Sequence, residues 1–369
     1  MSKDAKNVPA LRFKGYSDAW EKRKLGELAE FINGRAYKQD ELLTSGKYPV
    51  LRVGNFYTND KWYYSDLELP EKYYAEKGDL LYTWSATFGP HIWIGPKVIY
   101  HYHIWKVALK NLFEKDFALQ FFEADRVRLL NSTNGSTMIH VTKKDMESKG
   151  ILLPDVYEQR TIGELLKRVD DLIAATQDKI DALEQAKKAL LQRLFDQSWR
   201  FKGYSDPWEK RCLSDVLKVN SGRDYKHLSA GTIPVYGTGG YMLSVNKALS
   251  NQNAIGIGRK GTIDRPYLLN APFWTVDTLF YLTMKAAAEI AFVFPLLQRV
   301  HWKKLDESTG VPSLSKRVIE TLSVYVPDKK EQRAIGNLFF FLDTLIAATQ
   351  SRLSSLELLK KALLQDLFI

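Results

Sequence analysis

The chain has 369 residues, of which 45% are hydrophobic and 12% are aromatic. This length and composition are typical of a folded protein with two or more domains and exclude an intrinsically disordered chain. Its one cysteine, Cys212, excludes an internal disulfide and a four-cysteine zinc site, which favours a reducing, cytoplasmic location. The polar first residues and the lack of an apolar run of roughly 18 residues predict neither a signal peptide nor a membrane span.

The formal net charge of +10 favours a polyanionic partner, although many proteins share such a charge. The charge is unevenly distributed along the chain. Residues 29–153 contain 16 basic and 15 acidic side chains, whereas residues 217–326 contain 13 basic and 7 acidic ones. The second of these regions is therefore expected to attract a polyanion more strongly.

The first recognisable segment, residues 12–28, recurs at residues 200–216. The two copies read RFKGYSDAWEKRKLGEL and RFKGYSDPWEKRCLSDV. Shortly after each copy comes a shorter match, in which Gly34-Arg35 corresponds to Gly222-Arg223. Similarity of this extent indicates an internal duplication of the chain.

The region between the first copy and residue 153 is predicted to be α+β. Residues 48–55 are typical of a strand that runs into a turn, and residues 78–89 of a strand, a polar turn and a second strand. Polar side chains in such turns can contact base edges or phosphates, and aromatic rings can stack on bases or pack on sugars. The residues predicted to contact DNA here are Arg52, Asn55, Lys61, Trp84, Ser85 and Thr87. His101 and His103 share a face of an apparent strand, but without a third ligand beside them we do not expect a metal site.

A second repeat begins at Pro154 and at Pro327, and each copy is predicted to be one long helix. Asp155 and Asp328 are suited to cap the helix start, with Glu158 and Glu331 placed to return the hydrogen bond. Leucines and valines recur at heptad spacing and predict a stripe that two antiparallel helices bury against each other. Packing of each helix along its own domain is the alternative. The predicted stripe comprises Leu165, Val169, Leu172, Leu183, Leu190 and Leu194 in the first copy and Leu338, Leu342, Leu345, Leu356, Leu363 and Leu367 in the second.

The region between residues 217 and 326 repeats the signals of the first variable region. Residues 233–240 again predict a strand that enters a turn, and residues 253–263 a strand, a polar turn and a strand. The residues predicted to contact DNA here are Tyr236, Thr238, Tyr241, Arg259, Lys260 and Thr262.

The sequence contains no self-contained catalytic constellation. The glycine-rich run at residues 237–240 lacks the Lys-Ser or Lys-Thr of a phosphate-binding loop, and no Asn-Pro-Pro-aromatic or Asp-Pro-Pro-aromatic run for adenine methylation is present. We therefore predict a binding protein, with no catalytic residue and no metal ligand.

Taken together, these features resemble the specificity subunits of type I restriction–modification systems. The resemblance covers nearly the whole chain and rests on its duplicated layout and on the Pro-x-x-x-Glu-Gln-Arg helix entries at Pro154 and Pro327. It also rests on the glycine-rich strand loop at residues 257–263, which is followed by Pro272-Phe273-Trp274, and on polar turns around Gly135-Ser136 and residues 308–310.

The resemblance implies an α+β protein with two target-recognition domains, joined by two long antiparallel coiled-coil helices in a pseudo-two-fold repeat. The expected division is 1–153 and 200–326 for the recognition domains, and 154–199 and 327–369 for the spacer helices. Such a subunit reads a split, asymmetric site in double-stranded DNA and binds two methyltransferase and two restriction subunits. S-adenosylmethionine, ATP and Mg²⁺ are used by those partners, and this chain itself is expected to bind no cofactor. A stand-alone DNA-binding regulator with two reading heads is the alternative.

Overall fold

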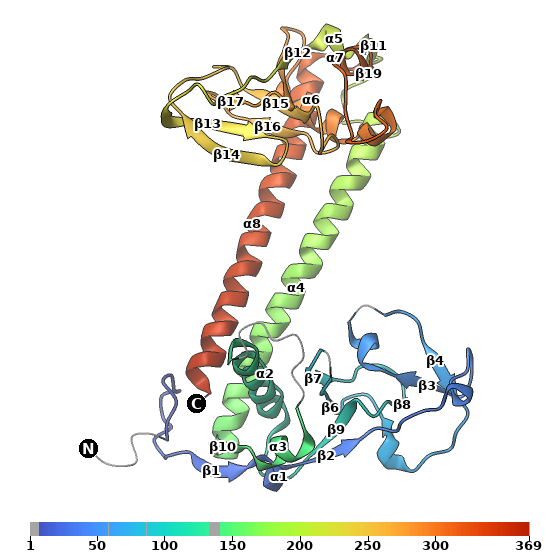
Figure 1. Ribbon diagram of the computed structural model, residues 1–369, viewed down its shortest axis with the longest axis vertical. Coiled ribbons are helices and arrows are strands. Elements are labelled where there is room, and N and C mark those ends of the chain that lie inside the picture. The colour runs from blue at the N-terminus through green and yellow to red at the C-terminus, as the bar shows by residue number, and fades with distance from the viewer. Residues whose placement is uncertain (1–6, 58, 86, 133–140, 369) are drawn as a thin grey trace. The chain divides into compact units, whose positions relative to one another are not determined.

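The structure, a computed structural model, describes residues 7–57, 59–85, 87–132 and 141–368. The chain forms two compact units, one of residues 1–176 with 352–369 and the other of residues 177–351. Each unit contains one variable region and a part of both long helices, α4 (Val156–Phe195) and α8 (Lys329–Leu367), which Figure 1 shows in green and red. Among the described residues, no helix is long and apolar enough to cross a membrane.

The first unit is built on two four-stranded sheets and a two-stranded ribbon. One sheet is antiparallel in the order β2-β9-β6-β7, and the other has the order β4-β3-β8-β5 with β3 and β8 parallel. The strands are β1 (Glu21–Lys24), β2 (Ala29–Asn33), β3 (Tyr48–Leu51), β4 (Tyr63–Ser65), β5 (Tyr74–Ala75), β6 (Leu80–Thr83), β7 (Gly89–Ile92), β8 (Val98–Tyr100), β9 (Ile104–Leu109) and β10 (Gly150–Leu153). The short helices are α1 (Leu25–Leu28), α2 (Lys115–Ser132) and α3 (Lys143–Ser148).

The second unit repeats this plan, including a two-stranded ribbon of β11 and β19, but its second sheet has three strands in place of four. Its antiparallel sheet has the order β12-β18-β15-β16, and its second sheet has the order β14-β13-β17 with β13 and β17 parallel. The strands are β11 (Glu209–Cys212), β12 (Leu217–Ser221), β13 (Ala230–Gly237), β14 (Gly240–Val245), β15 (Ala254–Gly258), β16 (Tyr267–Leu269), β17 (Trp274–Thr275), β18 (Leu279–Met284) and β19 (Ser323–Val326). The helices are α5 (Leu213–Val216), α6 (Ile290–Gln298) and α7 (Lys316–Glu320). The expected α+β class and the internal repeat are thus confirmed.

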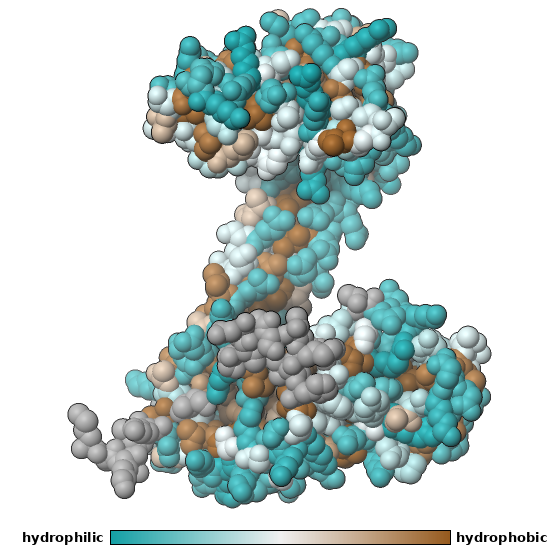
Figure 2. All heavy atoms as spheres, viewed as in Figure 1, coloured by the Kyte–Doolittle hydropathy of each residue, from teal (hydrophilic) through white to brown (hydrophobic). Residues whose placement is uncertain are grey.

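Each unit has its own hydrophobic core, formed where the antiparallel sheet, a short helix and the ends of α4 and α8 meet. In the first unit, Phe31 and Trp105 of the sheet pack with Phe122 of α2. In the second, Phe292 of α6 packs against Trp208 and Phe195. On the face that Figure 2 shows, the surface of each unit is mostly hydrophilic, as expected when the large apolar side chains are enclosed.

A buried carboxylate explains why residues 12–28 and the helix entries are repeated together. Glu158 is fully buried and accepts hydrogen bonds from Arg12 Nε at 2.7 Å, Arg12 Nη2 at 2.8 Å and Trp20 Nε1 at 3.1 Å. Glu331 accepts the same set from Arg200 and Trp208 in the second unit. Each RFKGYSDxW segment is therefore a clamp that fixes the start of a long helix to its own unit.

This clamp corrects one expectation about the helix starts. Asp155 and Asp328 do cap them, because each accepts a hydrogen bond from the backbone N–H three residues later, at 2.9 and 3.0 Å. Glu158 and Glu331, however, were expected to bond back to the capping residue. Their carboxylates instead face the arginine and tryptophan of the clamp, because a buried charge needs an opposite charge beside it.

The one glycine inside each long helix marks a close helix contact. A Cβ on Gly163 would lie 2.8 Å from the backbone nitrogen of Phe117, and one on Gly336 would lie 2.6 Å from Cβ of Ala291. Phe117 lies in the first turn of α2 and Ala291 in the first turn of α6, so these short helices pack directly on the backbone of α4 and α8. The repeated Ile-Gly pair thus serves the packing of each unit.

The long helices bury a stripe of side chains that differs in part from the predicted stripe. At several positions, the buried residue is the one that follows the predicted leucine. In α4 the buried positions of the stripe are Ile162, Leu166, Val169, Thr176, Ile180 and Leu194, so that Val169 and Leu194 were predicted correctly, whereas the predicted Leu172 is 45% exposed. In α8 they are Ile335, Phe339, Leu342, Ile346, Thr349, Leu364 and Leu367, so that Leu342 and Leu367 were predicted correctly. The two threonines are tolerated in the stripe because each hydroxyl donates to a carbonyl four residues earlier in its own helix.

The two long helices contact each other within each unit. In the first unit, Lys360 of α8 forms an ion pair of 2.5 Å with Asp170 of α4, and Leu364 shares a core with Leu166. In the second unit, Lys187 of α4 pairs with Asp343 of α8 at 2.5 Å, and Leu194 shares a core with Phe339. In both units, the last turns of one helix thus lie beside the first half of the other.

Candidate nucleic-acid interface

Arg259 and Lys260 lie on a tight loop that leaves strand β15. The loop closes because Gly258 approaches the backbone of Thr262 so nearly that a Cβ on Gly258 would lie 2.0 Å from the Thr262 carbonyl oxygen. Gly261 has a φ of +87°, a conformation that residues with side chains rarely adopt. The backbone N–H of Arg259 donates to the Thr278 carbonyl at 2.8 Å. The two basic side chains are exposed on a backbone that is fixed from both sides.

The loop after Gly258 differs from the predicted strand, turn and strand over residues 253–263. Strand β15 ends at Gly258 as expected, but the return strand β16 starts only at Tyr267. Residues 259–261 instead pair with another segment: the Gly261 N–H donates to the Pro312 carbonyl at 2.8 Å, and the Leu314 N–H donates to the Arg259 carbonyl at 3.0 Å. This distant pairing could not be read from the local pattern.

The hairpin of β13 and β14 brings the other three predicted residues of the second unit to the same place. A Cβ on Gly261 would lie 3.9 Å from the hydroxyl of Thr238, so the hairpin turn adjoins the Arg259 loop. The rings of Tyr236 and Tyr241 are 6.4 Å apart, and the second of them is 64% exposed. The six predicted residues of this unit therefore belong to the β13–β14 hairpin and to the loop that adjoins its turn.

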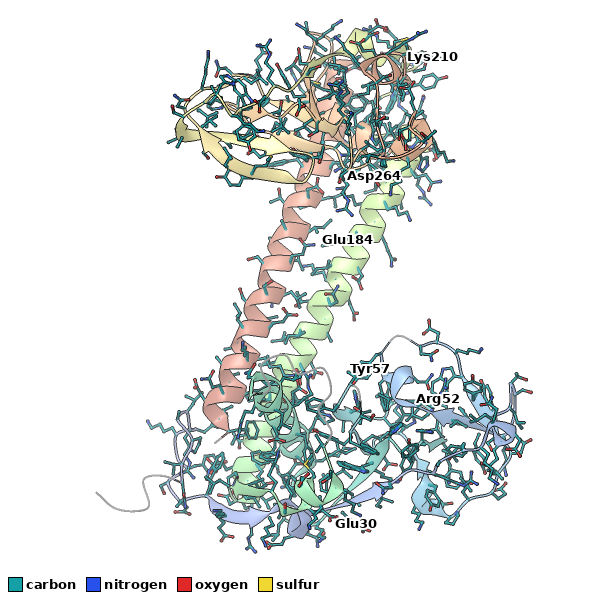
Figure 3. All side chains as sticks on the ribbon, viewed as in Figure 1. Glu30, Arg52, Tyr57, Glu184, Lys210 and Asp264 are labelled. Atoms are coloured by element: carbon teal, nitrogen blue, oxygen red, sulfur yellow. The ribbon has the colours of Figure 1, made fainter. Side chains whose placement is uncertain are left out.

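In the first unit, Arg52, Asn55 and Lys61 gather around a single aromatic ring. The guanidinium carbon of Arg52 lies 4.3 Å from the centre of the Tyr63 ring, and the ammonium of Lys61 lies 6.0 Å from it. The Asn55 side chain accepts from the Arg52 N–H at 3.0 Å and donates to the Lys61 carbonyl at 3.3 Å. Arg52 and Tyr57 lie on the same side of this unit, and Glu30 lies on the other (Figure 3).

Trp84 occupies the backbone position that Arg259 has in the second unit. Its N–H donates to the carbonyl of His103, as that of Arg259 donates to Thr278 in the corresponding turn. The Trp84 ring is half-buried, stacks on Trp105 and donates from Nε1 to the Tyr102 carbonyl at 2.9 Å. Ser85 and Thr87 follow it in the turn between β6 and β7. Equivalent backbone thus presents an indole in one unit and a guanidinium in the other.

Several aromatic side chains at this surface were not among the predicted residues. His101 and His103 lie in the turn between β8 and β9 rather than in a strand, with ring centres 5.0 Å apart. Tyr57 is 44% exposed, and its hydroxyl is 3.1 Å from Nε2 of His91. The sequence signal for the two histidines was their spacing, which indicated only a possible pair of metal ligands.

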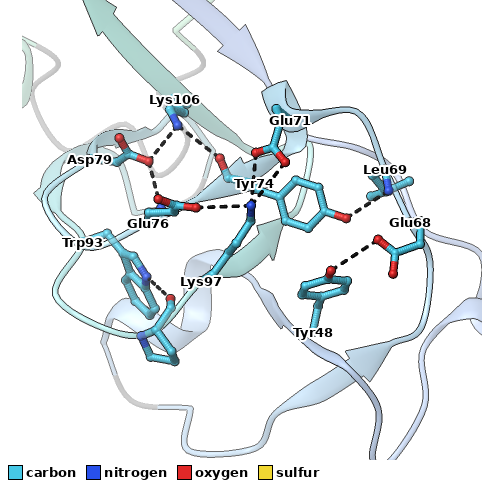
Figure 4. Close-up of polar contacts among 11 residues, drawn as sticks. Tyr48, Glu68, Leu69, Glu71, Tyr74, Glu76, Asp79, Trp93, Lys97 and Lys106 are labelled. Carbon is cyan, nitrogen blue, oxygen red and sulfur yellow. Dashed lines mark hydrogen bonds and ion pairs between the residues drawn. The ribbon is translucent and has the colours of Figure 1, made fainter.

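Residues 29–153, whose net charge is near zero, also form local ion pairs around strand β5. Lys97 lies 3.1 Å from Glu71 and 3.2 Å from Glu76, and Lys106 lies 2.7 Å from Asp79 (Figure 4). These lysines are thereby neutralised within the unit, and little of its basic charge around this strand is left for a polyanion.

Burial lowers the pKa of both His91 and His101 to about 4. An unfolded histidine has a pKa near 6.5, so between roughly pH 6.5 and pH 4 the unfolded chain binds more protons than the folded one. The first unit should therefore lose stability as the pH falls through this window, by about 1 kcal/mol per histidine at pH 5. Urea unfolding at pH 7.5 and at pH 5 would measure the loss. The variant His91→Phe should show a smaller loss, and an unchanged one would contradict the assignment.

Comparison with known proteins decides the family. A family model described as "Type I restriction modification DNA specificity domain" matches residues 17–185 and, a second time, residues 205–358. The chain belongs to this family. The two matches cover the two copies of the duplication, and each includes one set of the loops described above.

Named relatives of this DNA-specificity family agree with the assignment. The specificity subunit of the type I restriction enzyme MjaVIII of Methanocaldococcus jannaschii is 24% identical, over 94% of this chain and 91% of its own length. That of EcoBI from Escherichia coli is 22% identical over 47% of this chain and 37% of its own. The crystal structure of a type I S subunit from M. genitalium has the same fold, with a TM-score of 0.70, 19% identity, and coverage of 98% of this chain and 99% of that one.

Proposed function

We propose that this chain is the DNA-specificity subunit of a type I restriction–modification system and that each of its units reads one half of a split, asymmetric DNA site. The observation that carries the proposal is the double match to the DNA-specificity family, with one set of exposed and half-buried polar side chains on turns in each copy. Because Trp84 stands where the other copy has Arg259, the two units should prefer different bases. The net positive charge of residues 217–326 supports a polyanionic ligand.

The chemistry of the loops fits readout in the major groove. An arginine can donate two hydrogen bonds to the O6 and N7 acceptors of guanine, an asparagine can pair with the N6 and N7 of adenine, and serine and threonine can contact either base. We assign Arg259, Lys260, Thr262, Tyr236, Thr238 and Tyr241 to one half-site. Arg52, Asn55, Lys61, Trp84, Ser85 and Thr87 belong to the other.

We further propose that residues 1–153 and 200–326 are the target-recognition domains, and that residues 154–199 and 327–369 are spacer helices paired as an antiparallel coiled coil. The support lies inside each unit, where the ion pairs Asp170–Lys360 and Lys187–Asp343 join the end of one helix to the other in opposite directions. Buried positions at spacings of three and four residues fit such pairing. A helix of 40 residues such as α4 is about 60 Å long, which would set the gap between the half-sites.

Catalysis would belong to partner subunits in the cytoplasm. The proposal assigns adenine methylation to two methyltransferase subunits that use S-adenosylmethionine, and cleavage to two restriction subunits that use ATP and Mg²⁺. The relatives support this division, since they are named specificity subunits of type I restriction enzymes.

Sequencing of methylated bases in a host that carries the complete system tests the function. The expected motif has two short specified parts separated by an unspecified gap, with one methylated adenine in each part and on opposite strands. A short uninterrupted palindrome would contradict the proposal, because units that differ at Trp84 and Arg259 cannot read the same bases. Expression of this chain without a methyltransferase should leave the DNA unmethylated, and regulated transcription in that host would instead favour the stand-alone regulator.

A further inference from the structure

In the second unit, the polar turn at residues 308–310 is held in place by hydrogen bonds to one carboxylate. The carboxylate of Asp306 accepts three hydrogen bonds, from the backbone N–H of Ser308 at 3.0 Å, from its hydroxyl at 2.8 Å and from the N–H of Ser313 at 2.9 Å. These bonds hold the pKa of Asp306 below its usual range. The segment between them is exposed from Thr309 to Pro312. The first-unit counterpart, Gly135-Ser136, lies outside the described residues.

This turn is fixed directly to the loop that carries Arg259. Its return segment pairs with residues 259–261 through the two backbone hydrogen bonds of Pro312 and Leu314 described above and through a bridge between Lys260 and Ser313. The segment that follows leads into α7, which starts at Lys316. The proposed reading loop and this turn therefore form one supported surface, and neither can move without the other.

A cleft of about 320 Å³ lies between the two segments. Its walls carry three cations, Arg259, Lys260 and Lys316, together with the hydroxyls of Ser221 and Ser313 and one carboxylate, that of Glu307. Lys316 also forms an ion pair with Glu320, which does not line the cleft; this pair is weak, because the two side chains are 3.5 Å apart and half and one-third exposed. The three cations outnumber the single acid, and cations with hydroxyls are the groups that bind phosphate oxygens.

We propose that this cleft holds a backbone phosphate of the DNA, with Lys316 as a phosphate contact beside the base-reading loop. The inference rests on the proposed function. In this arrangement, Lys316 fixes how the second unit sits on the duplex and carries no base preference of its own. Asp306 acts as a positioning residue, because it accepts a hydrogen bond from the backbone N–H of Ser313, which lines the cleft.

The test compares Lys316→Gln with the wild-type chain, both at full length and assembled with the methyltransferase partner. DNA affinity is measured from about 50 to 200 mM salt, on a duplex with the methylated motif and on an unrelated duplex. Loss of one phosphate contact should weaken binding to both duplexes roughly fivefold to tenfold at low salt. It should also reduce the slope of log affinity against log salt by about 0.9. Lys316→Arg, which keeps the charge, should restore the slope.

Lys210→Gln is the matched control, because Lys210 is an exposed lysine of β11 in the same unit. Figure 3 shows it far from Asp264, which follows the Arg259 loop closely in the sequence. Equal effects of Lys210→Gln and Lys316→Gln, or an unchanged slope with Lys316→Gln, would overturn the inference. A third overturning result is binding of inorganic phosphate, measured by calorimetry without DNA and lost in Lys316→Gln, while DNA binding is unaffected. If the wild-type complex itself shows no preference for the motif, the proposed function fails, independently of Lys316.

Discussion

Replacing Glu331 with alanine should lower the free energy of unfolding of the second unit by about 3–5 kcal/mol. Glu331 is 1% exposed, and its carboxylate accepts hydrogen bonds from Nε of Arg200 at 3.0 Å and from Nη2 of Arg200 at 2.6 Å. The same hydrogen bonds raise the pKa of Arg200. Without the carboxylate, the partly buried guanidinium of Arg200 and the indole N–H of Trp208 would lose their acceptor. Removal of one partner of a buried ion pair is strongly destabilising because the other partner stays buried without a counter-charge.

Urea unfolding followed by tryptophan fluorescence would measure this loss, since Trp208 belongs to the clamp. Glu158→Ala should have a similar effect on the first unit, and this gives an internal repeat of the experiment. Glu184→Ala is the control, because Glu184 is exposed on the same helix as Glu158 (Figure 3), and it should change stability by less than about 0.5 kcal/mol. A loss below about 1 kcal/mol for both clamp variants would show that the duplicated segments are not clamps.

Arg259→Ala should weaken binding of the complex to its own DNA site by about 1–3 kcal/mol, the discrimination carried by a bidentate arginine–guanine contact. The effect should be confined to one half-site, because Arg259 lies on the second unit only. The supporting backbone is held by Gly258 and by the bonds to Thr278 and Leu314, so removal of the side chain should leave the loop in place.

The measurement is selection of bound sequences from a pool in which both half-sites are randomised. With Arg259→Ala, one position of one half-site should lose its preferred base, and the other half-site should keep all of its preferences. Arg211→Ala serves as the control, since that arginine is in strand β11 and pairs with Glu209. Loss of affinity for every sequence alike would make Arg259 a phosphate contact, as proposed for Lys316, and would contradict its role in base readout.

The parts of this protein that the sequence itself determined are those governed by local or repeated patterns. Two copies of RFKGYSDxW and two of the Glu-Gln-Arg helix entry are enough by themselves to establish the duplication. Asp155 and Asp328 placed the helix starts because capping acts over three residues. The heptad spacing predicted a buried stripe, although Leu166 rather than Leu165 is the fully buried position, because neighbouring leucines fit a helical period almost equally well.

Contacts between segments far apart in the chain were decided only by the tertiary structure. The partner of Glu158 is 146 residues away at Arg12, so a local capping pattern assigned the carboxylate to the wrong bond. The loop at Arg259 pairs with Pro312 and Leu314, which delays the return strand and creates the cleft beside Lys316. A local pattern records the preferences of a backbone over a few residues, whereas the neighbours of a buried charge or a surface loop depend on how the whole unit packs.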